Sequence, residues 1–181
     1  MLFNSYEFIF IFLPITLLIF HLLGKYGSHR VSIAWLVSAS LFFYSWWNPA
    51  YLWLMLFSIL FNYSVGTLLD KSVNTKQKRI IIIFGVVSNI GLLAYYKYAN
   101  FFIENISVLV DNDIIFNEVI LPLAISFFTF QQIAYLVDTY RGETKEYSFL
   151  HYCLFVTFFP QLIAGPIVHH KEMLPQFVRN S

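Results

Sequence analysis

The chain has 181 residues, of which 59% are hydrophobic and 12% charged, with a formal net charge of +1. Soluble domains are roughly half apolar and about one quarter charged, and a soluble domain of this size could not bury so much apolar surface. The composition therefore excludes a soluble enzyme, a disordered segment and a disulfide-rich scaffold, and the near-zero charge excludes a nucleic-acid-binding protein. It predicts an integral membrane protein.

Charged residues divide the sequence into apolar runs, and a helix of about 20 apolar residues crosses a bilayer. The first run covers residues 8–24. We expect it to be a retained span, because the N-terminus has no positive region and no small-residue cleavage site follows. Residues 31–69 are too many for one crossing, and Asn48-Pro49 lies near their centre. Because proline disfavours helix in the residue before it, this pair predicts a hairpin between two spans.

Residues 80–96 and 119–137 form two more runs, and residues 98–111 between them have the spacing of a short interfacial helix. The last run, residues 147–170, is interrupted by proline and glycine. The predicted fold is therefore an all-α, polytopic integral membrane protein with five transmembrane helices and one broken or re-entrant apolar segment. We expect residues 1–181 to belong to a single transmembrane domain.

Basic residues are concentrated in alternate loops, and the acidic residues between the fourth and fifth spans lie on the other side. The basic residues of these loops are Lys25, Arg30, Lys71, Lys76, Lys78, Arg79, Arg141 and Lys145, while Lys97 lies on the acidic side. Because basic loops stay in the cytoplasm, the pattern predicts an N-terminus outside the cell. Residues 76–79 are also suited to contact an anionic cofactor such as coenzyme A, but we favour the topological role.

The fifth run carries a polar face. Gln131, Tyr135 and Asp138 are spaced i, i+4 and i+7, so a helix places them on one side, and Arg141 follows directly. Polar residues within membrane spans must face protein or a polar cavity. Two interpretations stay open, namely hydrogen bonds between helices and a wall of the substrate cavity.

The last run breaks its own helix twice, at Pro160-Gln161 and at Gly165-Pro166. Irregular backbone at membrane depth is tolerated only where protein or a water-filled cavity satisfies its polar groups. A re-entrant element lining a cavity and a kinked span are both compatible with this pattern.

No cluster of cysteine and histidine has metal-ligand spacing, so the sequence predicts no metal site. His169 and His170 follow the second break, and we interpret them as interfacial polar residues. Cys153 lies in an apolar stretch and is expected to be a small buried side chain. The tryptophans and tyrosines around Asn48-Pro49 fit an aromatic belt at the membrane surface better than a sugar-binding platform.

Two stretches resemble signatures of the membrane-bound O-acyltransferase family, and of its bacterial polysaccharide branch in particular. The first runs from Leu121-Pro122-Leu123-Ala124 to Asp138-Thr139-Tyr140-Arg141-Gly142, with Ala124 where the family often has glycine. The second is Phe158-Phe159-Pro160-Gln161-Leu162-Ile163-Ala164-Gly165-Pro166-Ile167, continuing into Met173-Leu174-Pro175-Gln176-Phe177.

The resemblance implies an enzyme of the bacterial cytoplasmic (inner) membrane that transfers an acyl group from a cytoplasmic donor, such as acetyl-CoA, to a polysaccharide outside the membrane, such as alginate. No cofactor stays bound. The implied partners are membrane lipid, the polysaccharide acceptor and a periplasmic or extracellular acetyl-transfer protein. D-Alanyl transfer to teichoic acid and a non-enzymatic transporter or polysaccharide-export subunit are the alternatives.

The family's catalytic histidine lies after the Gly-Pro segment, and no residue of this chain matches its motif. The resemblance therefore implies an N-terminal portion that holds no catalytic residue and is inactive alone. The expected cavity residues are Gln131, Tyr135, Asp138, Arg141, Pro160, Gln161, Gly165 and Pro166. Gly165→Leu, which would fill the second bend, is expected to abolish acetylation in the full protein.

Overall fold

The computed structural model describes residues 4–110, 119–143 and 148–164, and within these ranges it contains helices and no strand. This confirms the predicted all-α class. The elements are a π-helical turn η1 (Phe8–Phe12), α1 (Leu13–Tyr26), α2 (His29–Trp47), α3 (Ala50–Lys71), α4 (Thr75–Val110), α5 (Ile125–Tyr140), α6 (Phe149–Thr157) and α7 (Phe159–Ala164).

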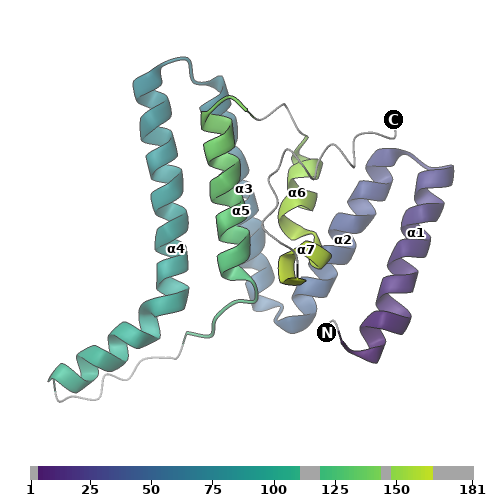
Figure 1. Cartoon of the computed structure of the whole chain (residues 1–181), viewed down its shortest axis with the longest axis horizontal. Coiled ribbons are helices and arrows are strands. Elements are labelled where there is room, and N and C mark those ends of the chain that lie inside the picture. Colours follow the sequence, from purple (N-terminus) through teal and green to yellow (C-terminus); the bar gives the residue numbers. More distant parts are fainter. Residues whose placement is uncertain (1–3, 111–118, 144–147, 165–181) are drawn as a thin grey trace.

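The helices stand in a row with α1 at one edge and α4 at the other (Figure 1). Helix α2 packs against α1 on one side and α6 on the other, and α5 packs against both α3 and α4. The main hydrophobic core lies where α3, α5 and α6 meet, and includes Met55, Phe128, Leu136 and Phe155, each fully or almost fully buried. Helix α5 is therefore the central element of the described part.

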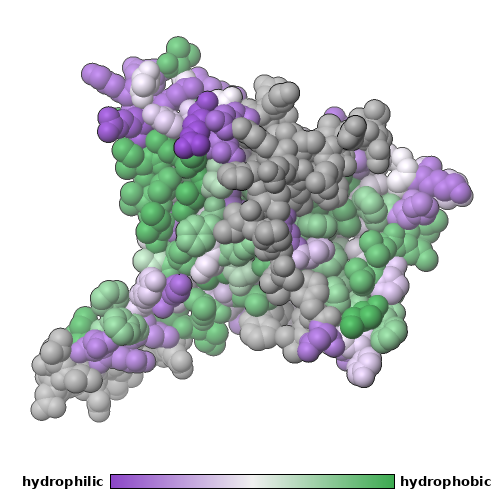
Figure 2. Space-filling model, viewed as in Figure 1, coloured by the Kyte–Doolittle hydropathy of each residue, from purple (hydrophilic) through white to green (hydrophobic). Residues whose placement is uncertain are grey.

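Among the described residues, three helices are long and apolar enough to cross a membrane: Phe8–Tyr26, Ala50–Lys71 and Thr75–Ser107. Along α4 the exposed side chains are largely apolar, among them Ile80 and Val87. Figure 2 shows the surface of this helix as hydrophobic, with hydrophilic residues at its upper end. Because apolar side chains on the outside of a bundle match a lipid environment, we treat the chain as a membrane protein. The remaining predicted spans, and the N-terminus outside, stay predictions.

The predicted hairpin at Asn48-Pro49 is confirmed. Helix α2 ends at Trp47, and α3 begins at Ala50 with Pro49 at its N-cap position. The Asn48 side chain accepts a hydrogen bond from the Ala50 backbone N–H at 3.0 Å, which satisfies one of the free donors at the start of α3.

The fifth predicted span, residues 119–137, begins later than expected, because helix α5 starts only at Ile125. Proline lacks an N–H and restricts the preceding residue, and Ala124 beyond Pro122 adopts a left-handed conformation with φ 56°. Side chains from other helices satisfy this irregular backbone. Tyr51 donates to the carbonyl of Ile120 at 2.6 Å, and the amide of Asn100 makes two hydrogen bonds with the backbone of Val119.

The interfacial helix expected near residues 98–111 is not a separate element in the described residues. It continues α4, which runs unbroken from Thr75 to Val110, because no proline interrupts the sequence there. The last turns of α4 bend away from the other helices (Figure 1).

The broken apolar segment is confirmed at its first break. Helix α6 ends at Thr157, Phe158 leaves the helical conformation (φ −54°, ψ 105°), and α7 starts at Phe159. Pro160 thus occupies the first turn of α7, where a missing N–H costs no helical hydrogen bond. The second break, at Gly165-Pro166, lies outside the described residues.

Candidate functional site

The polar face predicted on α5 is buried inside the bundle. Gln131, Tyr135 and Asp138 are 1%, 8% and 5% exposed. The structure therefore confirms that these three side chains turn away from the surface. We call them the α5 polar face.

Tyr135 is wedged between α3 and α6. Its ring packs against that of Tyr152 with 4.4 Å between centroids, and on the other side it lies against Gly66. A Cβ atom at position 66 would approach Tyr135 Cε1 to 2.5 Å and Cζ to 2.7 Å. Only a glycine leaves room for the ring there, so close helix packing holds Tyr135 in place.

Next to this face, a hydrogen-bond network joins α3, α4 and α5. The Oε1 atom of Gln132 accepts hydrogen bonds from Ser58 Oγ at 2.6 Å and from Asn62 Nδ2. Asn62 and Asn89 exchange amide hydrogen bonds of 3.1 and 2.6 Å. All four side chains are buried. The network therefore joins the three helices by hydrogen bonds, which are favoured in apolar surroundings because water does not compete for the polar groups.

Gln131 and Gln132 are neighbours with different surroundings. The Oε1 atom of Gln132 is engaged in the network and its Nε2 atom has no partner among the described residues, whereas neither amide atom of Gln131 has one there. The Oδ2 atom of Asp138 is buried without a partner in the same part of the chain. Interhelical hydrogen bonding thus explains the Oε1 atom of Gln132 and explains neither amide atom of Gln131. A buried amide without a partner is costly, which marks Gln131 as a candidate for binding.

The remaining predicted site residues do not join this face. Arg141 is exposed and caps the C-terminus of α5, where its backbone N–H donates to the carbonyl of Val137 at 3.0 Å. Pro160 is half-buried, and Gln161 is buried with its Nε2 atom unpaired among the described residues. Both lie on α7, which packs against α2. Gly165 and Pro166 lie outside the described residues.

The described residues contain no group of three histidine, cysteine or acidic side chains that could hold a metal ion. His151 pairs with Ser148 through a 2.6 Å contact from Nδ1 to Oγ, at the start of α6. Cys153 is a half-buried free thiol. His169 and His170 lie outside the described residues, so their predicted interfacial position stays a prediction.

Sequence reasoning missed three members of the network, namely Ser58, Asn62 and Asn89. A usable signal was present, because Ser58 and Asn62 are spaced i, i+4 within an apolar run and Asn89 interrupts the next one. Polar residues so placed usually face other helices. Their pairing with Gln132 depends on how α3, α4 and α5 pack, which no local pattern reveals.

Comparison with known proteins gives two kinds of relative. Over 98% of its length the chain is 44% identical to a peptidoglycan O-acetyltransferase of Helicobacter pylori, and it is 35% identical to a probable alginate O-acetylase, AlgI, of Pseudomonas aeruginosa. It spans 38% and 34% of the length of these proteins. No family model matches the chain, and no solved structure matches it. The resemblance in the two motifs is confirmed by similarity along almost the whole chain to these relatives, which belong to the membrane-bound O-acyltransferase family.

Proposed function

We propose that the complete protein containing this chain is an O-acyltransferase of the bacterial cytoplasmic membrane, which it crosses several times. It would move an acetyl group from a cytoplasmic donor, such as acetyl-CoA, to hydroxyl groups of a polysaccharide outside the membrane. The names of the relatives support this reaction, since they are an O-acetyltransferase of peptidoglycan and probable O-acetylases of alginate. A periplasmic or extracellular protein that receives or passes on the acetyl group is a further proposed partner.

The reaction requires a base and a path for the acyl group. A sugar hydroxyl attacks the acyl carbonyl, its proton passes to a general base, and the donor thiolate leaves. The base is proposed to be the family's histidine, outside this chain. The described residues would contribute one wall of the path.

The observation that carries this role is the pair of unpartnered amide atoms on Gln131, a side chain that is 1% exposed. An amide offers both a donor and an acceptor, which suits it to hold an acyl carbonyl or a sugar hydroxyl. Tyr135, held by Gly66 and Tyr152, would give the neighbouring wall a fixed position. Asp138 would lie at the end of the path that is nearer to Arg141, at the C-terminus of α5.

Gln131→Leu in the complete protein tests this role. Leucine is one atom shorter than glutamine but similar in volume, and it removes the unpaired buried amide, so stability should stay equal or rise. Acetylation should fall about tenfold or more if the amide binds a reacting group. We would express the variant in a strain lacking its own copy and measure acetate released by mild base from peptidoglycan and exopolysaccharide. Thermal unfolding of the purified variant gives the stability.

Gln132→Leu is the matched control, because the neighbouring glutamine accepts two interhelical hydrogen bonds and its loss should lower stability. Wild-type acetyl content in Gln131→Leu, at equal abundance, would contradict the proposed role of the face. A deletion that reduces the amount of polymer without changing its acetyl content would instead favour a transporter or export subunit. D-Alanine in the released material would favour D-alanyl transfer.

A further inference from the structure

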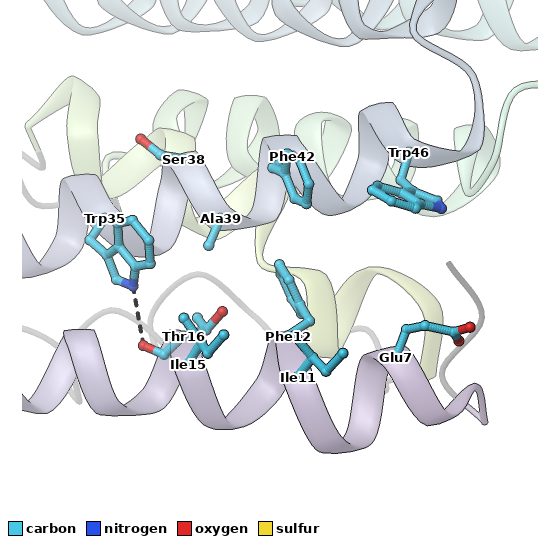
Figure 3. Close-up of a pocket in the computed structure, with 10 residues that line it drawn as sticks. All are labelled: Glu7, Ile11, Phe12, Ile15, Thr16, Trp35, Ser38, Ala39, Phe42 and Trp46. Atoms are coloured by element: carbon cyan, nitrogen blue, oxygen red, sulfur yellow. Dashed lines mark hydrogen bonds between the residues drawn. The ribbon is translucent and has the colours of Figure 1, made fainter.

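A groove runs along the outer edge of the molecule, between α2 and the continuous helix formed by η1 and α1 (Figure 3). Its volume is about 620 Å³. Ile11, Phe12 and Ile15 form one wall, and Ala39 and Phe42 form the other. The groove is thus open along a candidate membrane span, on a different surface from the α5 polar face.

The two ends of the groove differ. At one end the Trp35 indole N–H donates to the backbone carbonyl of Thr16 at 3.1 Å, which links α1 and α2 (Figure 3). At the other end lie the carboxylate of Glu7 and the indole of Trp46 (Figure 3). Thr16 lies nine positions after Glu7, so the groove extends about 14 Å at about 1.5 Å per residue.

The walls are suited to hydrocarbon. Ile11, Ile15 and Phe42 are 57%, 50% and 50% exposed, and the ring of Phe42 stacks on that of Phe12 with 6.2 Å between centroids. Apolar walls that face an empty space lose their dispersion contacts, and in a bilayer the molecules available at this depth are acyl chains. An acyl chain therefore fills the groove better than water or a polar polymer does.

The Glu7 end determines which lipid fits. A carboxylate attracts a cation and repels a purely anionic headgroup. The face of a tryptophan also attracts cations, and tryptophan is enriched at the level of lipid headgroups. Both groups at this end are exposed, and both are complementary to a headgroup that carries an ammonium group.

We propose that the groove binds one acyl chain of a membrane phospholipid with an ammonium-bearing headgroup, and that the ammonium lies at the Glu7 and Trp46 end. Bound lipid would fill the space between α1 and α2 and fix the position of α1, which packs mainly on α2. The site is separate from the proposed acetyl-transfer path, so the result at one site does not decide the other.

The test uses the complete protein in lipid nanodiscs that contain a phospholipid with a photoactivatable diazirine on its acyl chain. Two probes with the same acyl chains are compared, one phosphatidylethanolamine and one phosphatidylglycerol. We expect the ethanolamine probe to label peptides of α1 and α2 about tenfold more than the glycerol probe, equivalent to about 1.4 kcal/mol. Mass spectrometry of the digested protein locates the label.

Two variants with matched controls locate the site. Ser38 is exposed in the groove and its hydroxyl donates within its own helix, to the Ala34 carbonyl at 2.8 Å. Ser38→Phe should fill the groove and abolish its labelling, whereas Ser64→Phe should leave labelling unchanged, because Ser64 is also an exposed serine but lies on α3, outside the groove. Glu7→Gln should remove the preference for ethanolamine, whereas Glu104→Gln, on the far end of α4, should keep it.

Three results would overturn the proposal. Equal labelling by the two probes in the wild-type protein would show that the headgroup is not recognised. Labelling that persists in Ser38→Phe would place the acyl chain elsewhere. Labelling of α4 without any labelling of α1 and α2 would show that another part of the protein covers the groove.

Discussion

Ala124 illustrates how a single backbone angle explains a feature of the sequence. The residue precedes the first turn of α5 with φ 56°, in the left-handed region, where a side chain costs roughly 1–2 kcal/mol and glycine costs nothing. Glycine, which the resemblance to the family motif implies at this position, would carry no such cost. The start of α5 at Ile125 depends on this turn, and the uncharged apolar run alone placed that start too early.

Ala124→Gly is therefore expected to stabilise the protein. The relief of left-handed strain exceeds the extra entropy that glycine has in the unfolded chain, by about 0.5–1 kcal/mol. The measurement is thermal unfolding of the purified protein in detergent, followed by circular dichroism. Ala134→Gly, in the helical middle of α5, should destabilise by about 1 kcal/mol. If both variants lose stability alike, Ala124 is not strained.

At the same scale, sequence reasoning predicted the burial of Gln131, Tyr135 and Asp138 from their spacing alone. The spacing assigned Gln131 to this face but could not show which of the two neighbouring glutamines has hydrogen-bond partners, because a side chain's direction on its own helix does not reveal the groups that other helices bring to it. The difference comes from Ser58 and Asn62, which lie about 70 residues away in the chain and reach only Gln132.

At the scale of the helix, the predicted boundaries are right where a proline interrupts the helix. They are wrong where side chains from other helices stabilise a non-helical backbone. The helices are interrupted near Pro49 and Pro160, as expected from the missing N–H groups of these prolines. Residues 119–124 appeared to be the start of a span because they are apolar. Their irregular backbone is possible because Tyr51 and Asn100 satisfy it from α3 and α4, and this support is invisible in the local sequence.

The pair of asparagines joining α3 and α4 gives a prediction at this scale. Asn89→Leu removes the α4 partner of the Asn62 amide, and Asn62→Leu removes the α3 partner of Asn89 together with a donor to Gln132. Each variant should cost about 1–2 kcal/mol. The double variant should cost less than the sum of the two, by about 0.5–1.5 kcal/mol, because both partners of the bond are then removed together. Unfolding of the four proteins in detergent measures this double-mutant cycle.

Ser64→Ala is the control for the cycle, because its exposed hydroxyl bonds only within its own helix, to the carbonyl of Leu60. Its stability should stay within about 0.5 kcal/mol of wild type. Strictly additive losses for Asn62 and Asn89 would mean that their contact contributes no coupling energy.

At the scale of the whole molecule, the arrangement of the loops supports the predicted orientation. The loops joining α1 to α2 and α3 to α4 lie at the same edge of the molecule, and the loop joining α2 to α3 lies at the opposite edge (Figure 1). The first two carry or adjoin the basic residues Lys25, Arg30, Lys71 and Lys76. Since α1 and α3 are candidate spans, the antiparallel α2 between them must cross as well if both do.

Cysteine labelling of the complete protein in whole cells tests this orientation. In a Cys153→Ser background, which removes the one native thiol of this chain, and with any further native cysteines of the complete protein replaced, a membrane-impermeant maleimide should label Asn48→Cys. It should label Ser28→Cys and Ser72→Cys only after the cells are permeabilised, because the basic loops are retained in the cytoplasm. The reverse pattern would place the N-terminus inside the cell. The acetyl donor and the acceptor would then meet the chain from the opposite sides, and the proposed acyl path along α5 would run in the other direction.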